Sequence, residues 1–264
     1  MTRLVLFCGG PNIFPGPHGH SVSKPLALMS NGRTVLENYL ELKNLETFDE
    51  IVLLVENKDS EEFKKLDLRE SKFSGEIRIL KVSDHSSTLI KLLEFLTKEV
   101  SSTGQLCLSY PDIFYFGELS SLNHNVNFEE QVVVSAVFLQ TRFPQLSTNI
   151  YSGAVESISL KAKRVPANTG LIFAGHILSS KVFLEHKLQQ MFDSGADPAS
   201  SSLEGTFLKY LSSSGNLSSQ ILWETWLKAD SSRETDEIIQ KIRIWSQHVP
   251  KSRGNFRKIG EVEE

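Results

Sequence analysis

The sequence predicts an α/β fold in which a mixed, mostly parallel sheet is flanked by helices. Short apolar runs alternate with amphipathic helical patterns through the first half of the chain, which is the order of parallel βαβ units. The first apolar run, residues 4–8, ends at Gly9 and Gly10. Parallel strands deliver their loops to the edge of the sheet where ligands bind. The loop after residue 8 is therefore a candidate binding site, and phosphate is the first ligand to consider.

Hydrophobic period and capping patterns predict the other elements of the first half. Thr34 and Glu37 have the spacing of a capping box, and the helix that they begin carries apolar residues on one face, at positions 35, 36, 39 and 40. A second helix is predicted over 89–96, where leucines recur at helical spacing. Three further apolar runs are predicted to be buried strands: 51–55, 77–82 and 105–109.

The second half is predicted to be antiparallel in its middle section and helical at its end. Turn residues separate four short strand-like runs in that section: 131–139, 148–151, 154–160 and 170–173. Ser201 with Glu204, and Ser231 with Glu234, have capping-box spacing and predict two later helices.

Composition narrows the class of protein. A chain of 264 residues can form one large α/β domain, expected over 1–247, and the charged segment 248–264 is expected to be a flexible tail. With 28 basic and 32 acidic residues, the chain is not expected to bind a nucleic acid polymer. No apolar stretch approaches the roughly 20 residues of a membrane span, which favours a cytoplasmic protein. Cys8 and Cys107 lie in apolar runs and are expected to be buried thiols.

Several polar residues near the predicted strand ends each allow a functional and a structural interpretation. Lys24 follows the glycine loop, where a lysine supplies a mobile cationic charge for phosphate, although most lysines are simply solvated. Asp112 fits a metal ligand or the start of a turn, and Asp230 fits a ligand or a favourable charge before a helix. His18 and His20 flank Gly19, and no third ligand accompanies them to form a zinc site.

Together these residues resemble the sugar-phosphate nucleotidyltransferases, and most of all the glucose-1-phosphate cytidylyltransferase branch. That family opens with a strand, Gly-Gly-x-Gly-Thr-Arg and Lys-Pro, and here Gly9-Gly10 and Lys24-Pro25 stand at the family's separation. The family's metal-binding aspartate, in Tyr-Gly-Asp, is similar to Asp112 in Tyr110-Pro111-Asp112. Its second metal ligand, in Trp-x-x-x-Asp, is similar to Asp230 after Trp226.

The resemblance extends to the sugar-phosphate side and covers roughly residues 3–246. The family's sugar-phosphate lysine is similar to Lys161, and its Asn-x-Gly segment is similar to Asn168 and Gly170. The resemblance implies a Rossmann-like nucleotidyltransferase fold and an enzyme of nucleotide-sugar and polysaccharide biosynthesis. Such an enzyme joins a nucleoside triphosphate, with CTP considered first, to a sugar 1-phosphate and releases pyrophosphate. A homo-oligomer is compatible with it.

The resemblance also implies a role for each of these residues. Mg²⁺ is the implied cofactor, and the two aspartates are its implied ligands. The implied roles are nucleotide binding by Gly9, Gly10, His18, His20 and Lys24; sugar-phosphate binding by Lys161, Asn168 and Gly170; metal binding by Asp112 and Asp230; and catalysis by Lys24, Asp112 and Asp230. Two aspartates held close are expected to repel each other until the dication arrives.

The chain departs from the family at two places. Phe14 stands where the family has an arginine, and His18, His20 or Arg33 is a candidate to replace that cation. The family's base-contacting Thr-Gly-Gly is absent, with 84–88 in roughly that place. One alternative is therefore a catalytically degenerate protein that still binds a nucleotide or nucleotide sugar. A dinucleotide-dependent enzyme is a further alternative, although the first loop lacks Gly-x-Gly-x-x-Gly.

Overall fold

The computed structural model describes residues 2–16, 19–66, 68, 71, 73–99, 104–117, 119, 127–139, 145–148, 154–159, 170–198 and 200–247. The predicted tail, 248–264, lies outside these residues. The chain divides into two compact units. The first unit consists of Thr2–His85, Ser109–Leu119 and the segment from Glu224 onward, and the second consists of Ser86–Leu108 and Ser120–Trp223.

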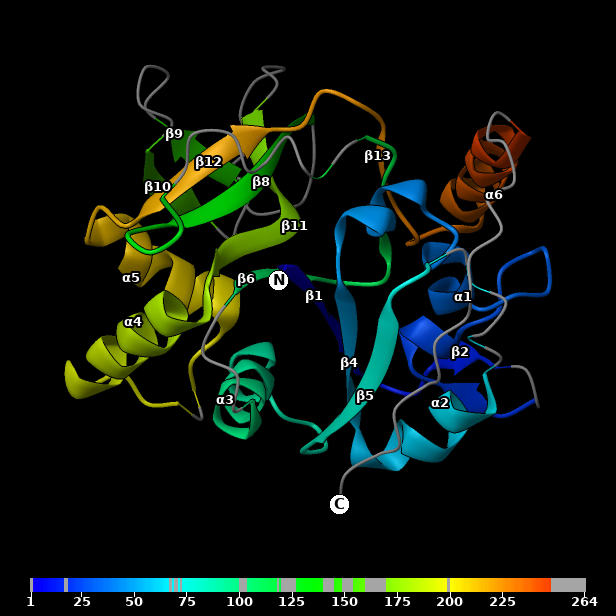
Figure 1. Ribbon diagram of the computed structural model, residues 1–264, viewed down its shortest axis with the longest axis horizontal. Helices are drawn as coiled ribbons and strands as arrows, with labels where there is room; N and C mark the ends of the chain where they lie inside the picture. The colour runs from blue at the N-terminus through cyan, green and yellow to red at the C-terminus, as the bar shows by residue number, and fades with distance from the viewer. Residues whose placement is uncertain are drawn as a thin grey trace. The chain divides into compact units, whose positions relative to one another are not determined.

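A parallel sheet forms the core of the first unit. Its strands pair in register, with Leu4 opposite Ile51 and Ile51 opposite Ile77, and Figure 1 shows them side by side. The first two are buried along nearly their whole length, as continuous apolar runs predict for strands covered on both faces. The three strands are β1 (Thr2–Cys8), β4 (Glu50–Glu56) and β5 (Glu76–Val82), and all three were predicted.

Short helices connect these strands. The predicted capping box is present in α1 (Val35–Tyr39), where Glu37 N donates to Thr34 Oγ1 over 3.2 Å and Thr34 N donates to Glu37 Oε2 over 2.6 Å. The pair predicted to begin the last helix is also in contact, since Glu234 N donates to Ser231 Oγ over 3.2 Å and Ser231 Oγ donates to Glu234 Oε2 over 2.9 Å. The remaining elements are a hairpin of β2 (Phe14–Pro15) and β3 (Ser21–Val22), helices α2 (Ser60–Lys65) and α6 (Ser232–Gln247), and 3₁₀ helices Lys24–Leu26, Lys43–Thr47 and Asn57–Asp59.

A small antiparallel sheet of the first unit joins segments that are far apart in the sequence. Its strands, β7 (Ile113–Tyr115) and β13 (Trp226–Lys228), place Lys228 opposite Ile113. Neither strand was predicted, because three residues are too few to establish a period. This sheet sets the residues just before β7 beside those just after β13.

The second unit is built around antiparallel strands, as predicted for the middle of the chain. The long strand β11 pairs antiparallel with β6, β8 and β9, while β12 pairs parallel with β8. Helix α5 packs against β10 and β12. The elements are α3 (Thr88–Lys98), β6 (Gln105–Ser109), β8 (Val132–Leu139), β9 (Gln145–Thr148), β10 (Val155–Ser159), β11 (Gly170–Ser180), α4 (Lys181–Asp193), α5 (Leu208–Ser213) and β12 (Leu217–Ile221).

Three details of the second unit differ from the prediction. Strand β9 ends at Thr148 instead of beginning there, and residues 149–151 lie outside the described part. Strand β11 runs on to Ser180 and leads directly into α4, which was not predicted. The serine that caps the π-helical turn Leu203–Phe207 is Ser202, whose Oγ accepts from Gly205 N over 2.9 Å, and not Ser201.

The predicted α/β, Rossmann-like class with a mixed sheet and flanking helices is confirmed. Cys8 and Cys107 are both buried, and neither forms a disulfide. Burial raises the pKa of the Cys107 thiol to about 12. No helix among the described residues has both the length and the apolar character needed to cross a membrane.

Candidate functional site

Three residues predicted from the sequence meet in the first unit. Lys24 Nζ donates to Asp112 Oδ2 over 2.8 Å, although the two residues are 88 positions apart. The same nitrogen donates to Asp230 Oδ1, 206 positions away. Two oxygens bonded to one nitrogen lie no more than about 6 Å apart. The sequence-based prediction that Asp112 and Asp230 lie close together is therefore fulfilled in the structure.

The backbone explains why the two carboxylates meet. Asp112 lies in the turn between β6 and β7, and Asp230 follows β13 by two residues. The pairing of β7 with β13 brings the two segments together, and Ala229 N donates to the main-chain oxygen of Asp112 over 2.9 Å. Asn44 Nδ2 holds the end of β7 and the chain after it, donating to Tyr115 O over 2.8 Å and to Gly117 O over 2.9 Å.

Lys24 reaches the carboxylates from a short, well-anchored turn. It begins the 3₁₀ helix Lys24–Leu26, in which Pro25 and Leu26 are buried. Ala27 N donates to Lys24 O over 3.1 Å, and Val35 N donates in turn to Ala27 O over 2.9 Å. These bonds connect the backbone at Lys24 to the start of α1 and fix the position from which the lysine side chain extends.

A second ammonium group joins the cluster, and the sequence analysis missed it. Lys228 Nζ lies 3.4 Å from Asp230 Oδ2 and 3.9 Å from Asp112 Oδ2. A usable signal existed, because residues two apart on an extended chain point to the same side. With two ammonium groups facing two carboxylates, the expected repulsion between the aspartates is compensated within the protein. The expectation that the two aspartates repel each other until a dication arrives is therefore wrong.

The shifts in pKa reflect this mutual neutralisation. Burial by itself would lower the pKa of Lys24, but the charges and hydrogen bonds of Asp112 and Asp230 outweigh it, so the pKa lies above the ordinary 10.5. Burial would raise the pKa of Asp230, but the hydrogen bond from Lys24 and the charge of Lys228 outweigh it and hold that pKa below 3.8. Lys24 and Asp230 are therefore both ionised at neutral pH.

The glycine loop lies at the carboxyl ends of the parallel strands. Gly10 has a φ of +130°, a conformation that side chains rarely tolerate, and a Cβ there would meet no heavy atom within 4 Å. Two contacts tie the loop to the turn after β4. Lys58 Nζ donates to Gly10 O over 2.9 Å, and Asn12 Nδ2 donates to Asp59 Oδ1 over 3.1 Å.

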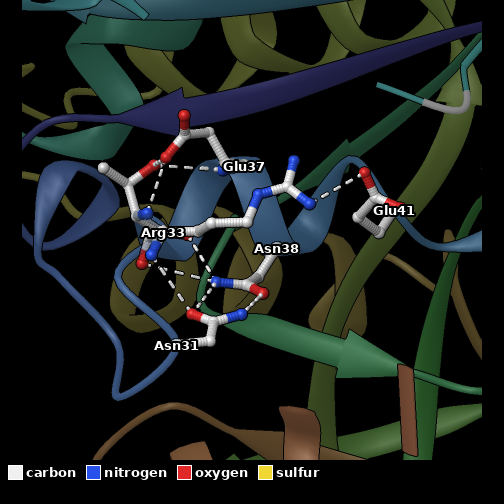
Figure 2. A network of polar contacts seen from close by, with 6 residues as sticks. Asn31, Arg33, Glu37, Asn38 and Glu41 are labelled. Carbon is white, nitrogen blue, oxygen red and sulfur yellow. Dashed lines mark hydrogen bonds and ion pairs between the residues drawn. The ribbon is translucent and has the colours of Figure 1, made fainter. Parts of the chain in front are cut away.

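Phe14 and two of the three residues considered as replacements for the family's arginine lie within the described part of the chain. Phe14 lies in β2, opposite Val22 of β3. Arg33 Nη1 donates to Glu41 Oε1 over 3.1 Å, and Figure 2 shows its guanidinium turned toward that carboxylate within a network around α1. His20 Nε2 lies 3.9 Å from Glu62 Oε2, and its main-chain oxygen accepts from Gly16 N over 3.1 Å. His18 lies outside the described residues.

The predicted sugar-phosphate residues belong to the second unit. Gly170 begins β11, opposite Leu139 of β8. Lys161 and Asn168 lie outside the described residues. Across the described part of the chain, no group of three or more His, Cys, Asp or Glu side chains is arranged to hold a metal. The two carboxylates of Asp112 and Asp230 remain the candidate donors, and Mg²⁺ commonly takes only one or two from a protein.

The fold defined above is shared with solved structures. The crystal structure of HddC from Yersinia pseudotuberculosis superposes with a TM-score of 0.68 at 15% sequence identity, covering 91% of this chain and 99% of that chain. The same protein complexed with GMP-PN gives a TM-score of 0.69 at 15% identity, with the same coverage. No protein-family model matches the sequence, and no curated protein matches it. Likeness at this identity establishes the fold, so the function has to be argued from the residues of the site.

Proposed function

We propose that the protein is a nucleotidyltransferase that joins a nucleoside triphosphate to a sugar 1-phosphate, forming a nucleotide sugar and pyrophosphate. The observation that carries the proposal is the cluster of Lys24, Asp112 and Asp230, assembled from three distant segments at hydrogen-bond distance. The binding of GMP-PN by the structurally similar HddC supports a nucleotide as one substrate. CTP and GTP are therefore the first two triphosphates to test.

The proposed reaction needs positioning and charge neutralisation more than acid or base groups. An oxygen of the sugar phosphate attacks the α-phosphorus of the triphosphate, the bond between that phosphorus and its bridging oxygen breaks, and pyrophosphate leaves with the electron pair. The backbone at Gly9 and Gly10 binds phosphate oxygens, and Lys24 stabilises negative charge on the transferring group. Lys161, Asn168 and Gly170 are proposed to bind the sugar phosphate.

The donor set fits Mg²⁺ as the cofactor. Asp112 and Asp230 offer two carboxylates within reach of one ammonium nitrogen, and hard oxygen donors of this kind suit Mg²⁺ together with phosphates and water. When bound, the ion would supply positive charge to the phosphates at this point. If the ion took the place of Lys24 at one of these carboxylates, the Lys24 ammonium group would be available to the substrate.

A screen of triphosphates against sugar 1-phosphates tests the proposal. Each of CTP, GTP, ATP and UTP is incubated with a panel of sugar 1-phosphates and Mg²⁺, and pyrophosphate release is followed by a coupled assay. Release that requires both substrates supports the proposal. If no pair releases pyrophosphate although a triphosphate binds, the chain is a binding protein instead.

Phe14 is the observation that favours this second function, a degenerate protein that binds nucleotides without turnover. Its aromatic ring stands in the loop where the resembled family carries a cation, and it pairs within the β2–β3 hairpin. Removing one preorganised charged donor costs a transition state about 2.7–4 kcal/mol. An inactive wild-type chain that gains turnover on Phe14→Arg would establish the degenerate function.

A further inference from the structure

We propose that Lys58 supplies the cation that the glycine loop lacks, and that its ammonium group contacts the terminal phosphates of the bound nucleoside triphosphate. This inference rests on the proposed nucleotide binding and names the residue that replaces the missing arginine. Lys58 lies in the turn after β4, 48 positions from the loop residue that it contacts, and no sequence motif indicates this role.

The geometry places this ammonium group at the loop itself. Lys58 Nζ donates to Gly10 O over 2.9 Å and forms an ion pair with Glu56 Oε2 at 2.8 Å. Its main-chain nitrogen donates to Asp84 Oδ1 over 2.9 Å, which links the turn to the segment after β5. The loops after β1, β4 and β5 therefore meet at Lys58, on the edge where parallel sheets bind ligands.

The side chain can accept a further partner. Its exposed fraction is 20%, whereas that of Glu56 is 1%. An ammonium group has three donors; Gly10 O uses one, and Glu56 Oε2 lies against a second at 2.8 Å. At least one N–H remains for a phosphate oxygen. The open space beside the Gly10 backbone lets a ligand approach the loop at this point.

Charge in and around the loop favours the same assignment. Residues 9–16 carry no charged side chain, yet a triphosphate brings several negative charges. Lys24 is shared between two carboxylates, and the Arg33 guanidinium is bonded to Glu41. Among the described residues, Lys58 has one carboxylate partner, Glu56, and it already contacts the loop backbone. A lysine here acts as a point charge on phosphate, as lysines of phosphate-binding loops do.

Binding measurements with ligands that carry one, two or three phosphates test the inference. Calorimetric titration of the wild-type chain with CTP, GTP, ATP and UTP identifies the base whose triphosphate binds most tightly. The triphosphate and monophosphate of that base, and pyrophosphate alone, are then titrated into Lys58→Met and Lys58→Arg. Lys58→Met should bind the triphosphate and pyrophosphate roughly 10- to 100-fold more weakly, as expected for one charge-assisted hydrogen bond. The monophosphate should lose much less, and Lys58→Arg should retain most of the affinity.

Three further variants separate a phosphate contact from a loop anchor. Asn12→Ala removes the other tie between the loop and the turn without removing a charge, so any loss should be similar for monophosphate and triphosphate. Lys64→Met removes an exposed lysine of α2 that pairs with Glu61, and it should bind like the wild type. Glu56→Gln leaves Lys58 in place and removes its competing charge, so it should bind the triphosphate at least as tightly as the wild type.

The outcomes are distinct. Equal binding by Lys58→Met and the wild type overturns the inference while leaving the proposed function intact. A loss of the same size for monophosphate and triphosphate, matching Asn12→Ala, shows that Lys58 only anchors the loop and also overturns it. If Lys58→Met fails to fold, weaker triphosphate binding by Glu56→Gln overturns it. A wild-type chain that binds none of the four triphosphates overturns both the proposed function and this inference.

Discussion

Lys24 Nζ lies 2.8 Å from Asp112 Oδ2, although the two residues are 88 positions apart. This contact joins the 3₁₀ helix Lys24–Leu26 to the turn between β6 and β7. Asp230 bonds to the same nitrogen from the carboxyl-terminal segment. Three segments of the first unit are thus held together by one ammonium group. The cluster contributes to stability as well as to the proposed chemistry, and the two contributions can be measured separately.

Replacing either aspartate tests the chemical contribution. Asp112→Asn and Asp230→Asn keep the shape of the side chain but remove the charge, and each should lower Mg²⁺-dependent turnover by at least ~10²-fold, as for other single electrostatic stabilisers. Steady-state pyrophosphate release measures this loss. Asp193→Asn, at an exposed position of α4, is the matched control. Wild-type turnover in both site variants would show that neither aspartate takes part in catalysis.

The same aspartate variants are expected to be less stable than the wild type. Two isolated carboxylates would repel, so removing one charge would stabilise the chain without metal. With Lys24 and Lys228 beside them, each substitution instead leaves ammonium charge uncompensated. We therefore expect the free energy of unfolding to fall by roughly 1 kcal/mol per variant.

Replacing Lys24 tests how much the cluster contributes to the stability of the fold. Lys24→Met removes the closer of the two ammonium groups from the carboxylates and leaves Lys228 at its longer distances, so the free energy of unfolding should fall by about 1–3 kcal/mol without Mg²⁺. Mg²⁺ should restore part of that loss, because the ion takes the place of the ammonium charge. Urea denaturation with and without Mg²⁺ measures both effects. Loss of the same size with saturating Mg²⁺ would mean that the ion does not bind at these carboxylates.

The sequence predicted the parts of the fold whose signals are local. Continuous apolar runs predicted β1, β4 and β5, and capping-box spacing predicted the starts of α1 and α6. Strands β7 and β13 were missed because each is three residues long and is stabilised by its distant partner rather than by its own pattern.

The candidate site shows the same division. Lys24, Asp112 and Asp230 were found because each stands in a motif that resembles a known family. Lys58 was missed because it stands in no motif, and Lys228 because it occupies one of the unspecified positions of Trp-x-x-x-Asp. The importance of both comes from contacts across the fold. Long-range contacts of this kind follow from the pairing of β7 with β13 and from the meeting of loops at one sheet edge.

Gly10 should be required for its backbone conformation and for the space beside it. Gly10→Ala places a side chain at a φ of +130°, which should cost about 1–2 kcal/mol of stability. Gly195→Ala is the matched control, since Gly195 has a φ of +100° and equally open surroundings in the second unit. Both variants should lose comparable stability in thermal unfolding, but only Gly10→Ala should weaken triphosphate binding. Unchanged binding by Gly10→Ala would separate the glycine loop from the nucleotide.

His176 should make the protein sensitive to acid. Its ring is buried in β11 with Nδ1 3.1 Å from Ser135 Oγ, and burial lowers the pKa of the imidazole from 6.5 to about 4. The folded state therefore keeps the ring neutral at a pH where the unfolded chain binds a proton, so stability falls as the pH drops through 6.5 and the loss is complete near 4.

This shift predicts a loss of about 3 kcal/mol over that range from His176 alone. His176→Asn removes the titrating ring, so its free energy of unfolding should depend less steeply on pH between 7 and 4. The variant starts from a lower stability at neutral pH, because a well-packed buried ring is lost, and the difference from the wild type should narrow in acid. Urea denaturation of both chains across this range measures the two slopes. Parallel curves would show that His176 is protonated in the folded state as readily as in the unfolded chain.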